Sequence, residues 1–232
     1  MSKILVVEDD PTVRRLVEFV LDQEGFEVLS FEGGQDAIDA LDTMTPDLAI
    51  VDLMMPDVDG IEVTRQIRAR SQFNKMPILV VTAKTHTVDR YEAFSAGADD
   101  YIVKPFDPME LTFRVRSYLR LTAGDGGAAI GPLDLGRVRL EPAKYTAYID
   151  DREVQLTKLE TAVMHYLMSH RDEVISAEQI AQRVLGQGSG AAARSVDAAQ
   201  AHIRHLRQKI EEDPANPTLI VTVGRKGYRF AA

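Results

Sequence analysis

The sequence contains no cysteine, and none of its apolar stretches is long enough for a membrane-spanning helix. Without cysteine, disulfide bonds and thiolate metal sites are excluded. A membrane span would need about 18 or more consecutive apolar residues. The N-terminus, MSKILVVEDD, turns acidic where a signal peptide would still be apolar. We therefore expect a cytoplasmic protein with no membrane partner.

Two parts of the chain differ in charge. The 232 residues are 45% hydrophobic and 27% charged, which is typical of a globular protein with one large domain or two ordinary ones. Residues 1–122 carry 13 Lys and Arg against 22 Asp and Glu, whereas residues 123–232 carry 14 of each. An acidic first part and a neutral second part indicate two units with different partners.

The first part alternates short apolar stretches with amphipathic ones. The apolar stretches predict strands, which are nearly all apolar because both faces of a parallel sheet are covered. They occupy residues 3–8, 27–30, 47–51, 77–81 and 100–103, and helices are expected at about 11–24, 34–44, 60–70, 87–96 and 107–121. Five such units predict an α/β fold with a doubly wound parallel sheet. Functional groups in these sheets gather beyond the carboxyl ends of the strands.

A Gly- and Ala-rich stretch, TAGDGGAA, separates the two parts and predicts a flexible linker. After it the order of elements changes. Short strand-like pieces are followed by three helices that open at Thr157, at Ser176 and at about Ser195. A β-hairpin with the basic turn GRK ends the chain. The predicted organisation is a domain over 1–121, a linker over 122–129 and an α+β domain over 130–232.

Charged and hydroxyl side chains follow four of the predicted strands. They are Glu8 and Asp9 after the first, Asp52 after the third, Thr82 after the fourth and Lys104 after the fifth. Because the first, third and fourth strands are neighbours in a doubly wound sheet, we expect the carboxylates to converge on one cleft. Carboxylates held together need a cation, and an oxygen-rich site suits Mg²⁺. The sequence therefore predicts a magnesium site with a lysine beside it.

This combination of groups suits phosphoryl chemistry. A metal ion and a lysine can neutralise a phosphoryl group while a carboxylate attacks it, which forms an acyl phosphate. Asp52 is the preferred nucleophile because it stands between the other contributors. Taken singly, Asp52 is more often a turn residue and Thr82 an ordinary helix N-cap. The chemical interpretation depends on all of these residues occurring together at the right strand ends.

The motifs VVEDD, VDLMMPDVDG, VTA and GADDYIVKPF occur in the order found in the receiver domain of two-component response regulators, which residues 3–121 closely resemble. The resemblance implies a flavodoxin-like sheet with strand order 2-1-3-4-5. It also implies that a sensor histidine kinase donates a phosphoryl group to Asp52. Asp57 and Asp59, in the same motif, are interpreted as turn and N-cap residues.

The resemblance further assigns roles to the other residues of the cleft. Asp9, Asp52 and the backbone carbonyl of Met54 would bind Mg²⁺, with Glu8 acting through water. The side chain of Lys104, which would precede a cis proline, would pair with the phosphoryl group. Thr82 and Tyr101 would form the switch that responds to phosphorylation.

A charge-patterned face runs from the fourth predicted helix to the fifth. One interpretation is a solvated surface; the other is an isologous twofold interface, in which each pair of opposite charges occurs twice. The sequence resembles the OmpR/PhoB branch, whose receivers dimerise through this face when phosphorylated. We predict exposed cross-dimer pairs, Arg90 with Glu110 and Asp100 with Arg114, that select register more than affinity. The predicted dimer-interface residues are Arg90, Asp99, Asp100, Glu110, Arg114 and Arg120.

The third helix of the second part has a basic face opposite a predicted buried stripe of Val196, Ile203, Leu206 and Ile210. Such a face is usually only solvated. Together with the basic hairpin turn, however, it predicts a helix in the major groove of DNA, with Lys and Arg on phosphates. The candidate DNA-binding residues are Arg194, His202, Arg204, His205, Arg207, Lys209, Arg225 and Lys226.

The layout of residues 130–231, ending in GYRF, resembles the winged-helix effector domain of the OmpR/PhoB branch. Three extra residues lie within AAQAH, before Ile203, so either the helix starts earlier or the loop absorbs them. His205 stands where Arg is common, and GRKG replaces the usual RGxG at the wing. The helix ending RVLG lacks the frequent Trp. RNA polymerase is a further expected partner.

These predictions combine into a DNA-binding transcriptional regulator. Mg²⁺-dependent phosphorylation of Asp52 would promote dimerisation and promoter binding. The chain would catalyse only its own phosphorylation and dephosphorylation, so a conventional enzyme is not expected. One rival is a metal-dependent phosphatase or phosphotransferase for small molecules, which lacks a matching general base. The other is a phosphorylation-independent regulator or scaffold, although every receiver position is filled.

Overall fold

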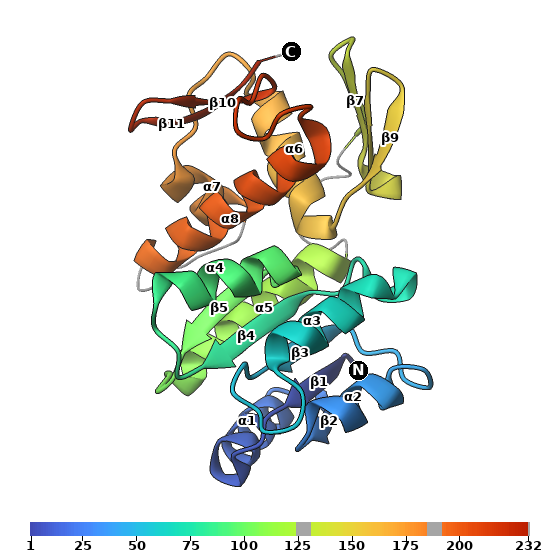
Figure 1. The fold of residues 1–232 in the computed structure, drawn as a ribbon, viewed down its shortest axis with the longest axis vertical. Helices are drawn as coiled ribbons and strands as arrows, with labels where there is room; N and C mark the ends of the chain where they lie inside the picture. The colour runs from blue at the N-terminus through green and yellow to red at the C-terminus, as the bar shows by residue number, and fades with distance from the viewer. Residues whose placement is uncertain (124–130, 185–191, 232) are drawn as a thin grey trace. The chain divides into compact units, whose positions relative to one another are not determined.

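The computed structural model describes residues 1–123, 131–184 and 192–231. The chain divides into two compact units, Met1–Arg120 and Leu121–Ala232 (Figure 1). Helix α5 (Pro108–Ala123) continues two residues into the predicted linker, and the remainder of that linker lies outside the described residues. No helix within the described ranges is both long and apolar enough to cross a membrane.

The first unit contains a five-stranded parallel sheet with the predicted order β2-β1-β3-β4-β5. Its strands are β1 (Lys3–Val7), β2 (Glu27–Phe31), β3 (Leu48–Val51), β4 (Ile78–Thr82) and β5 (Asp100–Val103). Every residue of β3 and β4 is buried, which explains why these strands are apolar without alternation.

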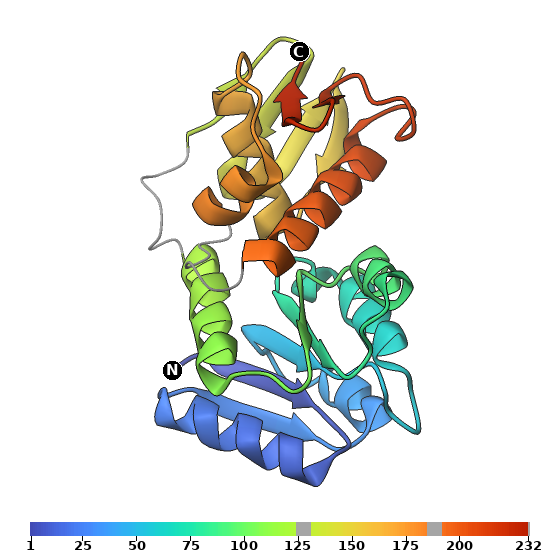
Figure 2. The ribbon, with the colours of Figure 1, turned by 90° about the vertical axis from the view of Figure 1, so that its left-hand side faces the viewer.

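Helices cover both faces of this sheet. Besides α5 they are α1 (Pro11–Gln23), α2 (Gly34–Ala40), α3 (Gly60–Ala69) and α4 (Thr87–Ala96), with a short 3-10 turn, η1 (Ser71–Phe73). Figure 2 shows α5 on one side of the sheet and α3 and α4 on the other. Asp10 begins α1, because its carboxylate accepts hydrogen bonds from the amides of Thr12 and Val13 at 2.7 and 3.2 Å.

The second unit contains two antiparallel sheets and three helices. One sheet has the order β6-β7-β8-β9, and the other is the hairpin β10-β11. The strands are β6 (Leu133–Asp134), β7 (Val138–Glu141), β8 (Thr146–Ile149), β9 (Arg152–Gln155), β10 (Ile220–Val223) and β11 (Gly227–Phe230), with a 3-10 turn, η2 (Pro142–Lys144). The helices are α6 (Lys158–Ser169), α7 (Ala177–Arg183) and α8 (Ala192–Ile210). This α+β arrangement is the one predicted for the second domain.

Two local features fix the helices and the hairpin of this unit. Thr157 and Glu160 form a capping box at the start of α6, as the sequence predicts. At Gly227, φ is +138° and a β-carbon would lie 2.2 Å from the carbonyl oxygen of Ile175, so only glycine fits there. Helix α8 is continuous through AAQAH, so the helix itself takes up the three extra residues.

Candidate functional site

Three acidic side chains meet at the carboxyl ends of β1 and β3. Glu8 and Asp9 follow β1, and Asp52 follows the neighbouring β3. One carboxylate oxygen from each of the three lies within 4.8 Å of the other two. The amide of Asp52 donates to the carbonyl of Val7 at 2.9 Å, which ties the two strand ends together. Only 3% of Glu8 and 4% of Asp52 are exposed. The convergence expected from the sequence is therefore present.

Lys104 reaches this cluster from the end of β5. Its Nζ atom lies 2.7 Å from Oδ2 of Asp52 and 2.6 Å from Oε2 of Glu8. Burial raises the pKa of Glu8, even though Lys104 opposes the shift. Burial alone would lower the pKa of Lys104, but its bonds to Asp52 and Glu8 outweigh burial and raise it. The Lys104–Pro105 peptide bond is cis, as the resemblance implies.

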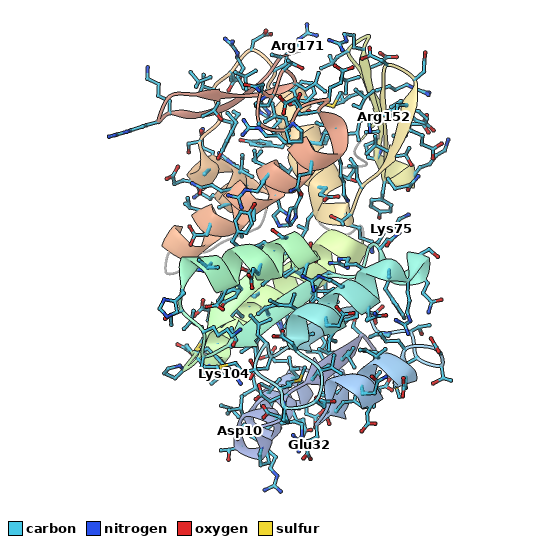
Figure 3. The ribbon with its side chains drawn as sticks, viewed as in Figure 1. Asp10, Glu32, Lys75, Lys104, Arg152 and Arg171 are labelled. Atoms are coloured by element: carbon cyan, nitrogen blue, oxygen red, sulfur yellow. The ribbon has the colours of Figure 1, made fainter. Side chains whose placement is uncertain are left out.

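The donor set fits a hard divalent cation. One ammonium group faces three carboxylates, so the cluster keeps a net negative charge. Carboxylate oxygens are the ligands that Mg²⁺ takes from proteins. The amide of Met54 donates to Oδ1 of Asp52 at 3.1 Å, and the predicted role of the Met54 carbonyl as a ligand stays a prediction. Figure 3 shows Lys104 and Asp10 at the same end of the first unit.

Thr82, at the end of β4, and Tyr101, on β5, are both buried. Oγ1 of Thr82 accepts a hydrogen bond from the amide of Lys84 at 3.3 Å, and the hydroxyl of Tyr101 donates to the carbonyl of Lys84 at 2.9 Å. Burial and the charge of Asp89 raise the pKa of Tyr101 to about 12. The guanidinium of Arg90 lies 5.4 Å from the centre of the Tyr101 ring. One short loop therefore contacts both predicted switch residues.

The two aspartates in the loop after Asp52, Asp57 and Asp59, each cap a helix. Asp59 begins α3 by accepting from the amide of Ile61 at 2.7 Å, as its N-cap interpretation predicts. Asp57 accepts from the amides of Gly34 and Gln35, so it caps α2, an element far away in the sequence. At Gly60 a β-carbon would lie 1.9 Å from the Asp52 carbonyl oxygen, so glycine lets the loop close against the site.

The structure corrects the predicted dimer contacts. Arg114 and Asp100 are fully buried and form an ion pair within one chain, so they cannot be the exposed cross-dimer pair that the sequence suggested. Arg114 also binds Glu110 at 2.8 Å. Asp99 is buried as well and accepts from Arg68 at 2.6 Å. These charges were predicted to be exposed because contacts between distant elements, such as Arg114 with Asp100 and Arg68 with Asp99, cannot be recognised in the sequence. The spacing of four between Glu110 and Arg114, in contrast, was visible.

Arg90 and Arg120 were also predicted to belong to the dimer face. Arg90 is half-buried over Tyr101, and the side chain of Arg120 lies outside the described residues. Exposed apolar side chains occur instead on the two helices that border β5. They are Val88 and Tyr91 on α4 and Met109 and Phe113 on α5. Large exposed apolar groups of this kind mark interaction surfaces when they cluster.

The basic face predicted for α8 also needs correction. His202 and His205 are buried and belong to the packed side of the helix. Lys209 is half-buried and binds Glu160 at 2.7 Å. The guanidinium of Arg207 donates to the carbonyl of Ile220 at 2.6 and 2.9 Å, so Arg207 attaches α8 to the hairpin.

A smaller set of basic residues remains exposed. Arg204 lies on the outer side of α8 between Gln200 and Gln208, one turn before and after it. Arg225 and Lys226 are exposed in the turn between β10 and β11. The two glutamines were absent from the predicted set, although their spacing of four from Arg204 was visible in the sequence. The side chain of Arg194 lies outside the described residues.

Comparison with known proteins identifies both units. Residues 4–116 match the family model for the response regulator receiver domain, and residues 151–230 match the C-terminal domain of transcriptional regulatory proteins. The chain is 35% identical over 99% of both sequences to the sensory transduction protein RegX3 of Mycolicibacterium smegmatis. It is 36% identical to the probable transcriptional regulator ycf27 of Porphyridium aerugineum, over 99% of this chain and 95% of that one.

A solved structure spans both units. The response regulator DrrB of Thermotoga maritima, an OmpR/PhoB homologue, aligns over 100% of both chains with 27% identity and a TM-score of 0.51. The fold and the acidic site thus define a receiver domain joined to a DNA-binding domain. The chain belongs to the OmpR/PhoB family of two-component response regulators.

Proposed function

We propose that this regulator is switched by transfer of a phosphoryl group from a sensor histidine kinase to Asp52. The observation that carries the proposal is the buried Asp52 carboxylate, held 2.7 Å from Lys104 between the strand ends that present Glu8 and Asp9. Transfer breaks the P–N bond of a phosphohistidine and forms a P–O bond to Asp52. The chain then catalyses only its own phosphorylation and dephosphorylation, so it is not a conventional enzyme.

Each residue of the acidic cluster would have a separate role in this transfer. The amide of Met54 holds one oxygen of Asp52, which leaves Oδ2 in contact with Lys104 to meet the phosphorus atom. Lys104 can then pair with a phosphoryl oxygen, because its charge already lies at that position. Bound Mg²⁺, held by Asp9, Asp52 and the Met54 carbonyl with Glu8 acting through water, would neutralise charge on the phosphoryl oxygens.

The signal is proposed to pass through Thr82 and Tyr101. Thr82 lies at the end of β4, and both residues bond to the backbone of Lys84. A hydrogen bond from Thr82 to the new phosphoryl group would pull on this shared loop and so reach Tyr101 and Arg90. The response is dimerisation through the face of α4, β5 and α5. Promoter binding by α8 and the hairpin, with recruitment of RNA polymerase, would follow.

Phosphorylation with a small donor tests the first step. The full chain is incubated with Mg²⁺ and acetyl phosphate, and hydroxylamine-labile phosphate is measured. We expect wild-type protein and Asp57→Asn to become labelled, whereas Asp52→Asn does not, because Asp57 caps a helix and Asp52 reacts. Unlabelled wild-type protein would refute the proposal and favour a phosphorylation-independent regulator.

A further inference from the structure

One arginine side chain bonds two consecutive backbone carbonyls of the β1–α1 loop, which presents Glu8 and Asp9. Nη1 of Arg14, on the first turn of α1, donates to the carbonyl of Glu8 at 2.6 Å and to the carbonyl of Asp9 at 3.2 Å. The amide of Glu8 donates to the carbonyl of Phe31 at 3.1 Å. Both carbonyl oxygens of the acidic pair therefore depend on Arg14.

Arg14 is itself held in place. Its Nη2 atom lies 3.3 Å from a carboxylate oxygen of Glu32, just beyond β2, and its side chain is only 17% exposed. Figure 3 shows Glu32 at the same end of the unit as Asp10 and Lys104. The planar guanidinium suits this task, because its N–H groups diverge in fixed directions toward several acceptors. The buried side of α1 is formed by Val17 and Leu21, so packing of the helix does not require an arginine at this position.

We infer that Arg14 is a positioning residue for the metal site, an inference that rests on the proposed Mg²⁺-dependent function. By bonding both carbonyls, it holds the loop in the conformation in which the carboxylates of Glu8 and Asp9 converge with that of Asp52. Without it, the loop would have to be ordered when the ion binds, and that entropy cost would weaken binding. Groups that orient metal ligands commonly change metal affinity about 10- to 100-fold.

The charge of Arg14 acts in the opposite direction, which makes the inference testable. A cation near a cation site repels the ion, so a purely electrostatic role predicts tighter Mg²⁺ binding when Arg14 is removed. Glu32 already compensates much of this charge at an exposed position, where solvent screens it further. Loss of positioning is therefore expected to exceed relief of repulsion.

The experiment measures Mg²⁺ binding to the unphosphorylated full chain by isothermal titration calorimetry. Arg14→Ala is expected to raise the dissociation constant about 10-fold. Arg14→Lys keeps the charge and the aliphatic stem but loses the fork, and is expected to raise it about 3-fold or more. Arg15→Ala, at the exposed neighbouring position, should bind as wild type does.

The outcomes separate the inference from the function on which it rests. Wild-type protein that binds no Mg²⁺ would refute the proposed function itself. If wild-type protein binds Mg²⁺ but Arg14→Ala binds equally or more tightly, the positioning role is wrong. A wild-type dissociation constant for Arg14→Lys would show that the planar guanidinium, with its two carbonyl contacts, is not needed, and this too would overturn the inference. Urea unfolding without Mg²⁺ shows that each variant is folded, and Arg14→Lys is the substitution that perturbs the helix least.

Discussion

Arg114, predicted to lie at a dimer interface, has a different role because of its surroundings in the fold. Its guanidinium is fully buried between Asp100 on β5 and Glu110 one turn earlier on α5. Burial alone would lower the pKa of Arg114, but these carboxylates outweigh burial and raise it, so the group stays charged. A buried ion pair adds little net stability, whereas removing one partner leaves the other charge buried and uncompensated. Arg114 therefore pairs with carboxylates of its own chain and is not exposed to a partner.

Removal of Arg114 should accordingly destabilise the receiver domain. We expect Arg114→Ala to lower the free energy of unfolding by about 3–5 kcal/mol, because Asp100 is left without its partner. Urea denaturation of the full chain measures this change in the receiver transition. The matched control is Arg116→Ala on the same helix, whose exposed pair with Glu24 should be worth less than about 1 kcal/mol. Equal effects of the two variants would show that the buried pair is not structural.

His205 makes stability of the second unit depend on pH. Burial and the neighbouring His202 lower the pKa of His205 to about 4, while Glu160 opposes them and Lys209 and Arg204 add to the decrease. Its Nε2 atom has no hydrogen-bond partner among the described residues. The folded state thus keeps this ring neutral at pH values where the unfolded chain, with a pKa of about 6.5, takes up a proton. Stability must therefore fall as pH falls below about 6.5.

This loss should amount to about 3 kcal/mol by pH 4, since one pKa unit corresponds to about 1.4 kcal/mol. The measurement compares thermal unfolding of wild type and His205→Gln between pH 7 and pH 4. The variant should lose most of this pH dependence in the effector transition, whereas His86→Gln, exposed in the other unit, should keep it. A variant with the wild-type pH profile would contradict the assignment.

At the scale of elements, the sequence predicts a strand or helix best where a single structural reason, such as burial of both faces, explains its pattern of apolar residues. The strands β1, β3 and β4 were found because both of their faces are buried, which leaves an unbroken apolar run. Helix α8 was less predictable because it packs against both α6 and α7. Its buried side is therefore wider than its apolar stripe and includes two histidines, which are found both inside proteins and on their surfaces.

The hairpin turn offers a test at this scale. Arg225 and Lys226 are exposed at its tip and are expected to contact DNA phosphates. Replacing both by Ala should weaken promoter binding for all sequences. It should also make the slope of log affinity against log salt less steep by about 2, since each phosphate contact contributes about 0.9. Fluorescence anisotropy at several salt concentrations measures the slope.

A matched control and a contrasting variant sharpen this test. Lys144→Ala, in the 3-10 turn of the other sheet of the unit, should leave the slope unchanged. Arg204→Ala, on the outer side of α8, should instead relax the base preference at a single position, because arginine contacts to base edges carry specificity. An unchanged salt slope for the hairpin variant would remove the turn from the DNA interface.

At the scale of the molecule, the acidic site could be predicted because its residues lie at strand ends. Lys104 and Glu8 are 96 positions apart, yet the order of a doubly wound sheet brings both to the same edge. Partners chosen by side-chain packing could not be predicted in this way. The Asp57 carboxylate accepts a hydrogen bond at the start of α2, and Arg68 forms an ion pair with Asp99. Each contact joins two segments whose proximity no sequence motif indicates. The predicted cross-dimer pair of Asp100 and Arg114 was wrong for the same reason.

The corrected dimer face leads to a different prediction for assembly. Asp100 and Arg114 are paired internally, whereas apolar side chains on α4 and α5 are exposed, among them Met109 at 78% and Phe113 at 40%. We expect these apolar groups to supply the attraction in the proposed dimer. Burying such groups contributes about 25 cal/mol per Å² of apolar surface, whereas exposed ion pairs contribute little. We therefore expect Phe113→Glu to prevent the dimerisation that we propose acetyl phosphate to induce in wild-type protein, measured by sedimentation velocity. Phe19→Glu, an equally drastic change on α1 at a side chain that is 63% exposed, should still dimerise. If the phosphorylated Phe113→Glu protein were still dimeric, the interface would have to be formed by the charged residues rather than the apolar ones.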